Sequence, residues 1–585
     1  MKSFFKSFLA ALLALFIFSF LGVMLLIGIA ASVSSEETVA VPANAVLVID
    51  LGEAYTEKEV SDPFTEIMSP GKGKLPSLSN LIGLIQHAKK DSSIKGIYIK
   101  CQQNPNGYAA SEEIRKALVD FKKSNKFIVA YGETISQKGY WVGNVANGIY
   151  THPQGGLEFN GFSLETVFLK GMLDKLDVEM QVFYAGKFKS ATEPFRYTKM
   201  SDANKLQTSV WLNGLYNDFI TTVSNSRNIA PEKLKAMADE AKIQSAQDAL
   251  SNGLVDGLYY DDQFKKMVAK KLKGIAEKDI PFVSIKDYAK SVALRGSGSG
   301  KIAVVYADGD IVMGKNIKES IASDDFRLLL QKIRGDESID ALVLRVNSPG
   351  GSALASDIIW RELELIKARI PVIVSMGDVA ASGGYYIAAG ADSIFADANT
   401  ITGSIGVFTV IPNISGFMQN KLGVTFDGVK TATYADGPSA TRPLNSMEQK
   451  MLQAGVDSIY HTFKSRVAKG RKKSIEYIDS IAQGRVWLGA DAVGVGLVDR
   501  IGTLNDAIAS AAKKAKLKGY SIKQYPEPKS FFEDFIEDYQ DYVKVKSIES
   551  EIGASQWQIL NHMKSVQKMV GAPQTRLPIF VVKQP

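Results

Sequence analysis

The sequence predicts an α/β fold built from two tandem copies of one unit, and three observations support this. Apolar strands, tight turns and amphipathic helices alternate along the chain. Matching segments recur at a constant offset. The composition is that of a globular protein, with 45% apolar and 22% charged residues in a chain of 585. At roughly 150 residues per domain, this length allows several domains.

The alternation is clearest in the second copy. Residues 341–346 form a continuous apolar run typical of a buried strand, and Asn-Ser-Pro-Gly-Gly over 347–351 predicts a turn. Apolar residues then recur at helical spacing over 353–368. We expect a second strand over 371–376 and a second turn over 377–384. Strands separated by helices in this way usually pair in parallel.

The repeat has a single offset of 245 residues, and residues 93–100 match residues 338–345. Four more positions of the first copy fall on identical residues of the second: Gly132, Gly139, Tyr140 and Gly161 correspond to Gly377, Gly384, Tyr385 and Gly406. One offset held over this distance predicts a duplicated domain.

The N-terminal segment predicts a membrane anchor. Residues 7–33 contain no charged side chain, and Lys2 and Lys6 precede them. A spanning helix needs about 20 apolar residues, whereas the apolar region of a cleavable signal peptide has about 7–15. We therefore expect a single uncleaved transmembrane helix over 7–33, a cytoplasmic N-terminus over 1–6 and the rest of the chain outside.

The remaining domain boundaries follow from the repeat. The first copy is expected over 34–295 and the second over 300–525, joined by a glycine-rich linker at 295–301. A tail over 526–585 follows, and its aromatic residues are expected to pack on a neighbouring subunit: Phe531, Phe532, Phe535, Tyr539, Tyr542 and Trp557.

The composition excludes several functional classes. A net charge of +7 is mild for this length and predicts no nucleic-acid partner. The single cysteine, Cys101, excludes an intramolecular disulfide and a cysteine-rich zinc site. The four histidines have no short metal-ligand spacing, so we expect no metal and no cofactor. A buried, inert thiol is the commoner state for such a cysteine, and its role as a nucleophile is the weaker reading.

Two turns of the second copy could carry chemistry, because ligands of parallel sheets bind beyond the carboxyl ends of the strands. One turn offers Gly350 and Gly351, whose backbone N–H groups can approach a ligand closely. The other presents Ser382 among small residues at the start of a helix. A nucleophile beside backbone donors suits acyl transfer. Alternatively, Ser382 caps the helix and the glycines permit tight packing.

No histidine lies near either turn, so a base would have to be another residue. Lysine can serve when burial lowers its pKa from about 10.4 towards neutrality. Lys187 and Lys189 of the first copy would share one face of an extended segment, and the spacing does not choose between them.

Each copy lacks what the other retains. Opposite Ser382 the first copy has Gln137, and opposite Gly351 it has Asn106. Beyond residue 161 the match continues after a three-residue shift, and opposite Lys189 the second copy then has Thr431. This pattern is expected of a duplicated enzyme that divides its nucleophile and its base between the halves.

These motifs together resemble the signal peptide peptidase A family (protease IV) in its long, duplicated form, within the Clp protease/crotonase superfamily. The resemblance rests on Gly-Asp-Val-Ala-Ala-Ser-Gly-Gly-Tyr at 377–385, Asn-Ser-Pro-Gly-Gly at 347–351, Thr-Gly-Ser-Ile-Gly at 402–406 and Gly-Lys-Phe-Lys-Ser-Ala-Thr-Glu-Pro-Phe at 186–195. It covers essentially the whole chain and implies two ββα spiral domains.

The resemblance also implies residue roles. Ser382 would be the nucleophile, Lys189 the general base, and Ser404 the residue that orients the lysine. Backbone N–H groups among Gly350, Gly351 and Gly383 would bind the oxyanion.

The resemblance further implies a serine endopeptidase that forms a homotetrameric bowl over the membrane and degrades signal peptides left in the bilayer. The expected location is the inner (cytoplasmic) membrane, with the catalytic body on the periplasmic side. Two alternatives are a catalytically inactive membrane-tethered scaffold and a crotonase-like acyl-CoA enzyme. The second needs no serine nucleophile and normally works in the cytoplasm, which the predicted anchor disfavours.

Overall fold

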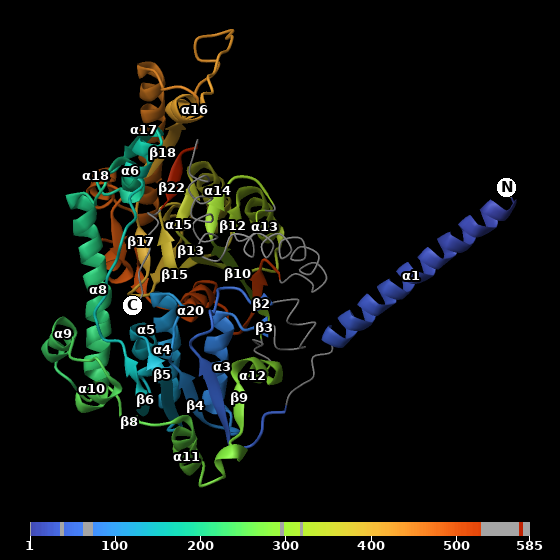
Figure 1. Ribbon diagram of the computed structural model, residues 1–585, viewed down its shortest axis with the longest axis vertical. Coiled ribbons are helices and arrows are strands. Elements are labelled where there is room, and N and C mark those ends of the chain that lie inside the picture. The colour runs from blue at the N-terminus through green and yellow to red at the C-terminus, as the bar shows by residue number, and fades with distance from the viewer. Residues whose placement is uncertain are drawn as a thin grey trace.

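The computed structural model describes residues 2–34, 40–61, 74–292, 298–315, 317, 320–527 and 572–576. Most of the first half of the chain forms the lower unit of Figure 1, and most of the second half forms the upper unit. Part of the predicted linker and all six aromatic residues of the predicted tail lie outside the described residues.

The first unit is built on a six-stranded parallel sheet in the order β8-β6-β5-β4-β1-β9. Its strands are β1 (Ala45–Asp50), β4 (Ile94–Lys100), β5 (Phe127–Ile135), β6 (Gly148–Leu157), β8 (Gly257–Leu258) and β9 (Phe282–Ser284). Leu47, Ile97 and Ile128 are in register across three strands and lie in the core. Central strands of a parallel sheet are apolar because helices cover both faces.

The helices of the first unit connect these strands or follow them. They are α3 (Leu78–Lys90), α4 (Tyr108–Lys122), α5 (Gln137–Gly143), α6 (Lys170–Lys175), α7 (Glu193–Arg196), α8 (Asp202–Arg227), α9 (Pro231–Asp239), α10 (Ala246–Ser251), α11 (Asp261–Lys271) and α12 (Ile285–Ser291). Ser77 and Ser201 cap α3 and α8 by accepting backbone N–H groups of the first turn.

The second unit has an eight-stranded sheet in the order β19-β17-β15-β13-β10-β21, with β16 joining β15 to β20. Its strands are β10 (Gly300–Asp308), β13 (Ala341–Ser348), β15 (Val372–Ala381), β16 (Ser393–Ala396), β17 (Ile401–Gly403), β19 (Val486–Leu488), β20 (Arg500–Ile501) and β21 (Tyr520–Tyr525). Its helices are α13 (Ser323–Gly335), α14 (Ala353–Lys367), α15 (Gly383–Ala388), α16 (Ser415–Leu422), α17 (Ser446–Arg471), α18 (Ile475–Ile481), α19 (Gly489–Gly494) and α20 (Leu504–Lys514).

The predicted α/β alternation is confirmed, and the helix predicted over 353–368 is α14. The turn predicted over 377–384 is wrong in its first part, because β15 continues to Ala381. Residues 379–381 pair with β17, and this pairing keeps the segment extended.

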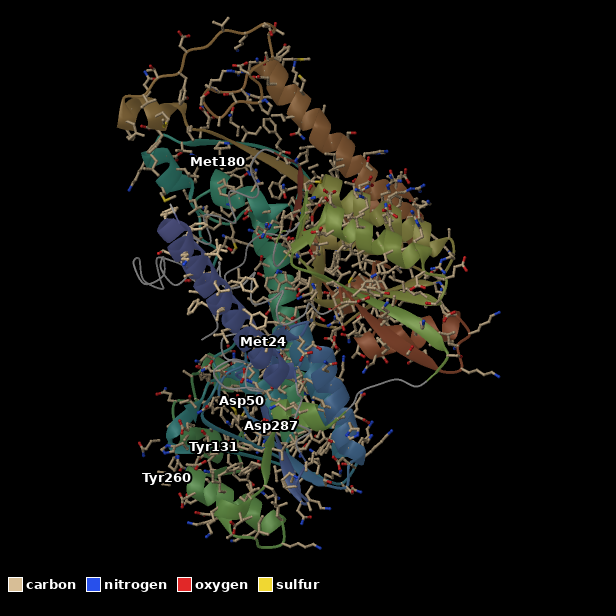
Figure 2. The ribbon with its side chains drawn as sticks, turned by 90° about the vertical axis from the view of Figure 1, so that its right-hand side faces the viewer. Met24, Asp50, Tyr131, Met180, Tyr260 and Asp287 are labelled. Atoms are coloured by element: carbon tan, nitrogen blue, oxygen red, sulfur yellow. The ribbon has the colours of Figure 1, made fainter. Side chains whose placement is uncertain are left out.

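A third sheet joins the two units in the order β12-β11-β14-β22-β18-β7. Its strands are β7 (Glu179–Ala185), β11 (Asp310–Val312), β12 (Ser320–Ala322), β14 (Gly350–Ser352), β18 (Val407–Asn413) and β22 (Gln574–Arg576). Strand β7 comes from the first half of the sequence but pairs antiparallel with β18 over its whole length. Figure 2 shows the result, because Met180 of β7 lies in the upper unit while Asp50 and Tyr131 lie in the lower one.

The duplication is visible in conserved local contacts. The Tyr140 hydroxyl donates to the Leu254 carbonyl at 2.7 Å, and the Tyr385 hydroxyl donates to the Leu497 carbonyl at 2.8 Å. In the same way Arg227 pairs with Asp256, and Arg471 pairs with Asp499. The predicted repeat of one unit is confirmed.

Buried ion pairs fix the units against each other. Arg345 of β13 lies within 2.8 Å of carboxylate oxygens of both Glu57 and Glu113, which belong to the first unit. All three side chains are buried. Removing one partner of a buried pair costs several kcal/mol, roughly 3–5. The relative position of the units is thus strongly determined.

Helix α1 (Lys2–Ser34) extends away from the two units in Figure 1. Apolar side chains such as Phe8, Leu13 and Phe18 are exposed on it. Within the residues that the structure describes, no helix combines the length and hydropathy needed to cross a membrane. The anchor expected over residues 7–33 stays a prediction.

Candidate active site

Ser382 lies where β15 ends and α15 begins, in a strained backbone conformation. Its φ is 55° and its ψ is −112°, a region that residues with a side chain rarely occupy. The backbone is held there by a hydrogen bond from Ser382 N to the Gly403 carbonyl at 2.8 Å, and the Ser382 carbonyl accepts from Tyr386 N in the first turn of the helix. Such strain persists where the surrounding structure determines it, often at functional sites.

Lys189 follows β7 on a short loop that reaches into the second unit. The loop is fastened by a hydrogen bond from Phe188 N to the Gln483 carbonyl at 2.7 Å. Gly484 and Gly406 flank the lysine stem so closely that a Cβ on Gly484 would lie 2.7 Å from the Lys189 Cβ. Both glycines therefore leave room for the side chain. Only 1% of Lys189 is exposed.

The lysine amine and the serine hydroxyl are in direct contact. Lys189 Nζ lies 2.9 Å from Ser382 Oγ, 3.1 Å from Ser404 Oγ and 3.2 Å from the Ser404 carbonyl oxygen. All three residues are buried. The structure thus brings together the three side chains that the sequence analysis assigned to the nucleophile, the base and its support.

Burial lowers the pKa of the Lys189 amine well below its ordinary value, because an ammonium ion loses its hydration in this site. The neutral amine keeps a lone pair that can accept a proton from Ser382 Oγ. General bases work best when their pKa lies near the working pH.

Ser404 lies between β17 and β18, with a positive φ of 49°. Its N–H donates to the Arg485 carbonyl at 2.7 Å, which fixes the turn. Because its hydroxyl and its carbonyl both face Lys189 Nζ, the residue can hold the amine in one orientation.

Of the three candidate oxyanion glycines, Gly383 directly follows Ser382 and Gly350 lies close to Gly383, while Gly351 is the next residue in the chain after Gly350. Gly350 and Gly351 have φ values of 96° and 155° and form the start of β14. A Cβ on Gly350 would lie 2.6 Å from Gly383 N, so these two residues are neighbours across the site. A side chain at Gly350 would therefore block the approach to the Gly383 donor.

Sequence reasoning missed Gln207 of α8. Its amide nitrogen donates to the Phe188 carbonyl and to Ser190 Oγ, both at 3.0 Å, and its amide oxygen accepts from Val486 N at 3.2 Å. It thus ties the lysine loop to strand β19 of the second unit. One glutamine in a long polar helix gives no sequence signal of this role.

Two other candidates lie apart from the site. Lys187 is exposed, with its amine 5.8 Å from the centre of the Phe188 ring. Cys101 is buried in the first unit, and burial raises the pKa of its thiol to about 12. A thiol that stays protonated is a poor nucleophile.

Two family models match this chain. The model of peptidase family S49 matches residues 120–275 and 364–518, one segment in each unit. The Clp protease model matches residues 298–400.

Three curated relatives align over most of the chain. "Protease 4" of Salmonella typhi is 38% identical over 460 residues, which cover 77% of this chain and 74% of that protein. "Protease 4" of Haemophilus influenzae is 35% identical over 515 residues, covering 84% and 83%. "Serine protease SPPA, chloroplastic" of Arabidopsis thaliana is 32% identical over 493 residues, covering 82% and 71%. The chain therefore belongs to peptidase family S49 and is a serine protease.

Proposed function

We propose that this serine protease is a membrane-anchored endopeptidase that uses a dyad of Ser382 and Lys189. The observation that carries the proposal is the 2.9 Å contact between Lys189 Nζ and Ser382 Oγ, in surroundings that disfavour the charged amine. The nucleophile comes from the second unit and the base from the first.

In the proposed mechanism, neutral Lys189 accepts the proton of Ser382 Oγ as this oxygen attacks a peptide carbonyl carbon. Backbone N–H groups among Gly350, Gly351 and Gly383 stabilise the oxyanion of the tetrahedral intermediate. The protonated lysine then gives its proton to the leaving amine, and an acyl-enzyme forms. Water, deprotonated by Lys189, hydrolyses the ester and restores the serine.

The proposed substrates are apolar peptides, in particular signal peptides left in the membrane after preprotein processing. The uncharged stretch over residues 7–33 supports an anchor in the inner membrane that places the catalytic units on the periplasmic side. Four copies would assemble into a bowl over the bilayer, and exposed apolar side chains on α8, such as Leu206 and Val210, offer surface for such contacts.

The test uses the full-length protein in detergent micelles with a fluorogenic peptide that has an apolar core. We expect hydrolysis by the wild type, and a loss of about 10³-fold or more in the Ser382→Ala variant. A serine-directed acylating probe should add its mass to the tryptic peptide that contains Ser382. Full activity in Ser382→Ala, or labelling elsewhere only, would contradict the proposed role of Ser382.

A further inference from the structure

Helix α8 runs along both units in Figure 1, and its residue Gln207 bonds to the loop that carries the base. Only 1% of Gln207 is exposed. Its amide nitrogen donates to the Phe188 carbonyl and to Ser190 Oγ, and these two residues flank Lys189 in the chain. Its amide oxygen accepts from Val486 N. One side chain thus bonds to both neighbours of the base and to a strand of the second unit.

The strand that Gln207 contacts is paired with the strand that holds the nucleophile. Val486 of β19 lies opposite Gly403 of β17. The Gly403 carbonyl accepts the hydrogen bond from Ser382 N at 2.8 Å. The residue after Gly403 is Ser404, whose hydroxyl contacts the base. Gln207 therefore bonds the lysine loop to the same pair of strands that fixes the backbone of Ser382.

The orientation of the Gln207 amide is set by its partners. The Phe188 carbonyl only accepts and the Val486 N–H only donates, so the amide nitrogen faces the loop and the amide oxygen faces the strand. Asn204, one turn earlier on α8, fits this orientation. Its Nδ2 donates to Glu193 Oε2 at 2.9 Å, so its Oδ1 faces Gln207 Nε2, at 3.4 Å. A carboxylate at this position would lack the donor, and an apolar side chain would lack both the donor and the acceptor.

Glu193 fastens the far end of the lysine loop to the same helix. Its carboxylate accepts from Asn204 Nδ2, from Ser201 N and from Ser201 Oγ. Ser201 is the N-cap of α8, and a helix N-terminus favours a negative charge. Glu193, Asn204 and Gln207 are all buried. One helix thus bonds to the loop on both sides of Lys189.

The contact between base and nucleophile leaves little room for movement of this loop. Reacting groups must be held within about 0.5 Å of their productive geometry, and a displacement of about 1 Å can cost about 10²-fold in rate. We propose that Gln207 is a positioning residue, which holds the loop of Lys189 against the strands of the second unit and so keeps the amine beside Ser382 and out of water. This inference rests on the proposed dyad of Ser382 and Lys189.

The first test measures the accessibility of the Lys189 amine and needs no hydrolysis. The full-length protein is treated with a trace of acetic anhydride, and acetylation of Lys189 is compared with that of exposed Lys187 by mass spectrometry. Gln207→Leu removes the hydrogen bonds with little change in size, so the ratio of Lys189 to Lys187 labelling should rise about tenfold. Phe219→Leu, in the part of α8 that packs in the core of the first unit, is the matched control and should leave the ratio unchanged. An unchanged ratio in Gln207→Leu would overturn the proposal.

The second test measures turnover of a fluorogenic peptide. Gln207→Leu should lower kcat about tenfold and leave KM within about twofold, because Gln207 bonds to the loop and the strand rather than to the substrate. Gln207→Glu keeps an acceptor for Val486 N but adds a negative charge beside the lysine loop. This charge favours the ammonium form, so activity should rise only at a higher pH than in the wild type.

Phe219→Leu should lower the midpoint of thermal unfolding without changing kcat or the pH at which activity rises. An equal loss of kcat in Phe219→Leu and Gln207→Leu would overturn the positioning role, since the loss would then follow stability. A wild type that cuts no peptide would contradict the proposed function, and the labelling ratio would still decide whether Gln207 holds the loop in place.

Discussion

The two units share one framework but differ in the residue that follows one corresponding strand. This strand is β5 in the first unit and β15 in the second. There the second unit has Ser382, whose hydroxyl faces an amine. The first unit has Gln137, whose amide oxygen accepts from Asn160 N and Gly161 N at 2.8 and 3.0 Å, while its nitrogen donates to the Gly161 carbonyl at 2.9 Å. The Gln137 amide is thus engaged in three hydrogen bonds with the backbone.

The glycine turns differ in the same way. In place of Gly351 the first unit has Asn106, whose side chain accepts from Tyr55 N at 2.7 Å and donates to the Glu53 carbonyl at 3.0 Å. In the second unit, glycine backbone lies near Ser382 at this turn. In the first unit, the side-chain amides of Gln137 and Asn106 form hydrogen bonds with the surrounding backbone. The proposed mechanism therefore needs from the first unit only β7 and the loop that follows it, which lie outside its own sheet.

The largest expected effect comes from replacing Lys189, the buried lysine that contacts Ser382, and the comparison is with Lys138, a buried lysine of the first unit. Lys189→Met keeps the length of the side chain but removes the base, so the turnover of a fluorogenic peptide should fall by about 10³-fold. Lys138→Met is the matched control. Lys138 is also buried, and burial lowers its pKa to about 8, but it follows Gln137 in the closed site. Its substitution should leave turnover within about twofold. Equal losses in both variants would indicate damage to the fold and would remove Lys189 from the mechanism.

The second-largest effect is expected in the pH dependence of turnover, which should depend on Lys189 and not on Lys138. Only the neutral amine of Lys189 accepts a proton, so activity should fall about tenfold per pH unit below its pKa and reach a plateau above it. Since burial lowers that pKa, the plateau should begin well below pH 10.4, the ordinary value for lysine. Initial rates of peptide hydrolysis from pH 4 to 11 measure this rise in activity, and Lys138→Met should not shift the pH at which it occurs. A limb at the ordinary lysine pKa would show that the amine is solvated.

Removal of the support for the base should cost less than removal of the base. Ser404→Ala deletes the hydroxyl 3.1 Å from Lys189 Nζ but leaves the carbonyl contact at 3.2 Å. We expect turnover to fall about tenfold with little change in KM, because the lost hydrogen bond orients the amine rather than the substrate. Ser404→Thr should recover part of the rate, and Ser458→Ala, at an exposed serine of α17, is the control. An unchanged turnover in Ser404→Ala would exclude an orienting role.

The sequence supported the α/β class, the duplication and the residues of the site, because strand and helix periodicity and short glycine-rich motifs are local signals. It could not supply what depends on long-range contact. The spacing of Lys187 and Lys189 does not show which amine is buried; the β7–β18 pairing and the close approach of Gly484 decide that. Strand β22 has only three residues, all polar, so no alternation marks it.

The smallest effect on activity is expected from replacing Gln137, the counterpart of Ser382 in the first unit. Gln137→Ser copies the serine of the second unit into the first, but Lys189 contacts Ser382 and so cannot serve the new hydroxyl. A serine-directed probe should not label position 137, and turnover should stay within about twofold. The shorter side chain cannot make all three amide hydrogen bonds, so the free energy of unfolding should fall by roughly 1–3 kcal/mol. Thermal melts against Gln154→Ser, an exposed glutamine of β6, measure this loss. Labelling at position 137 would show that the first unit keeps a working site, and the contrast between the units would fail.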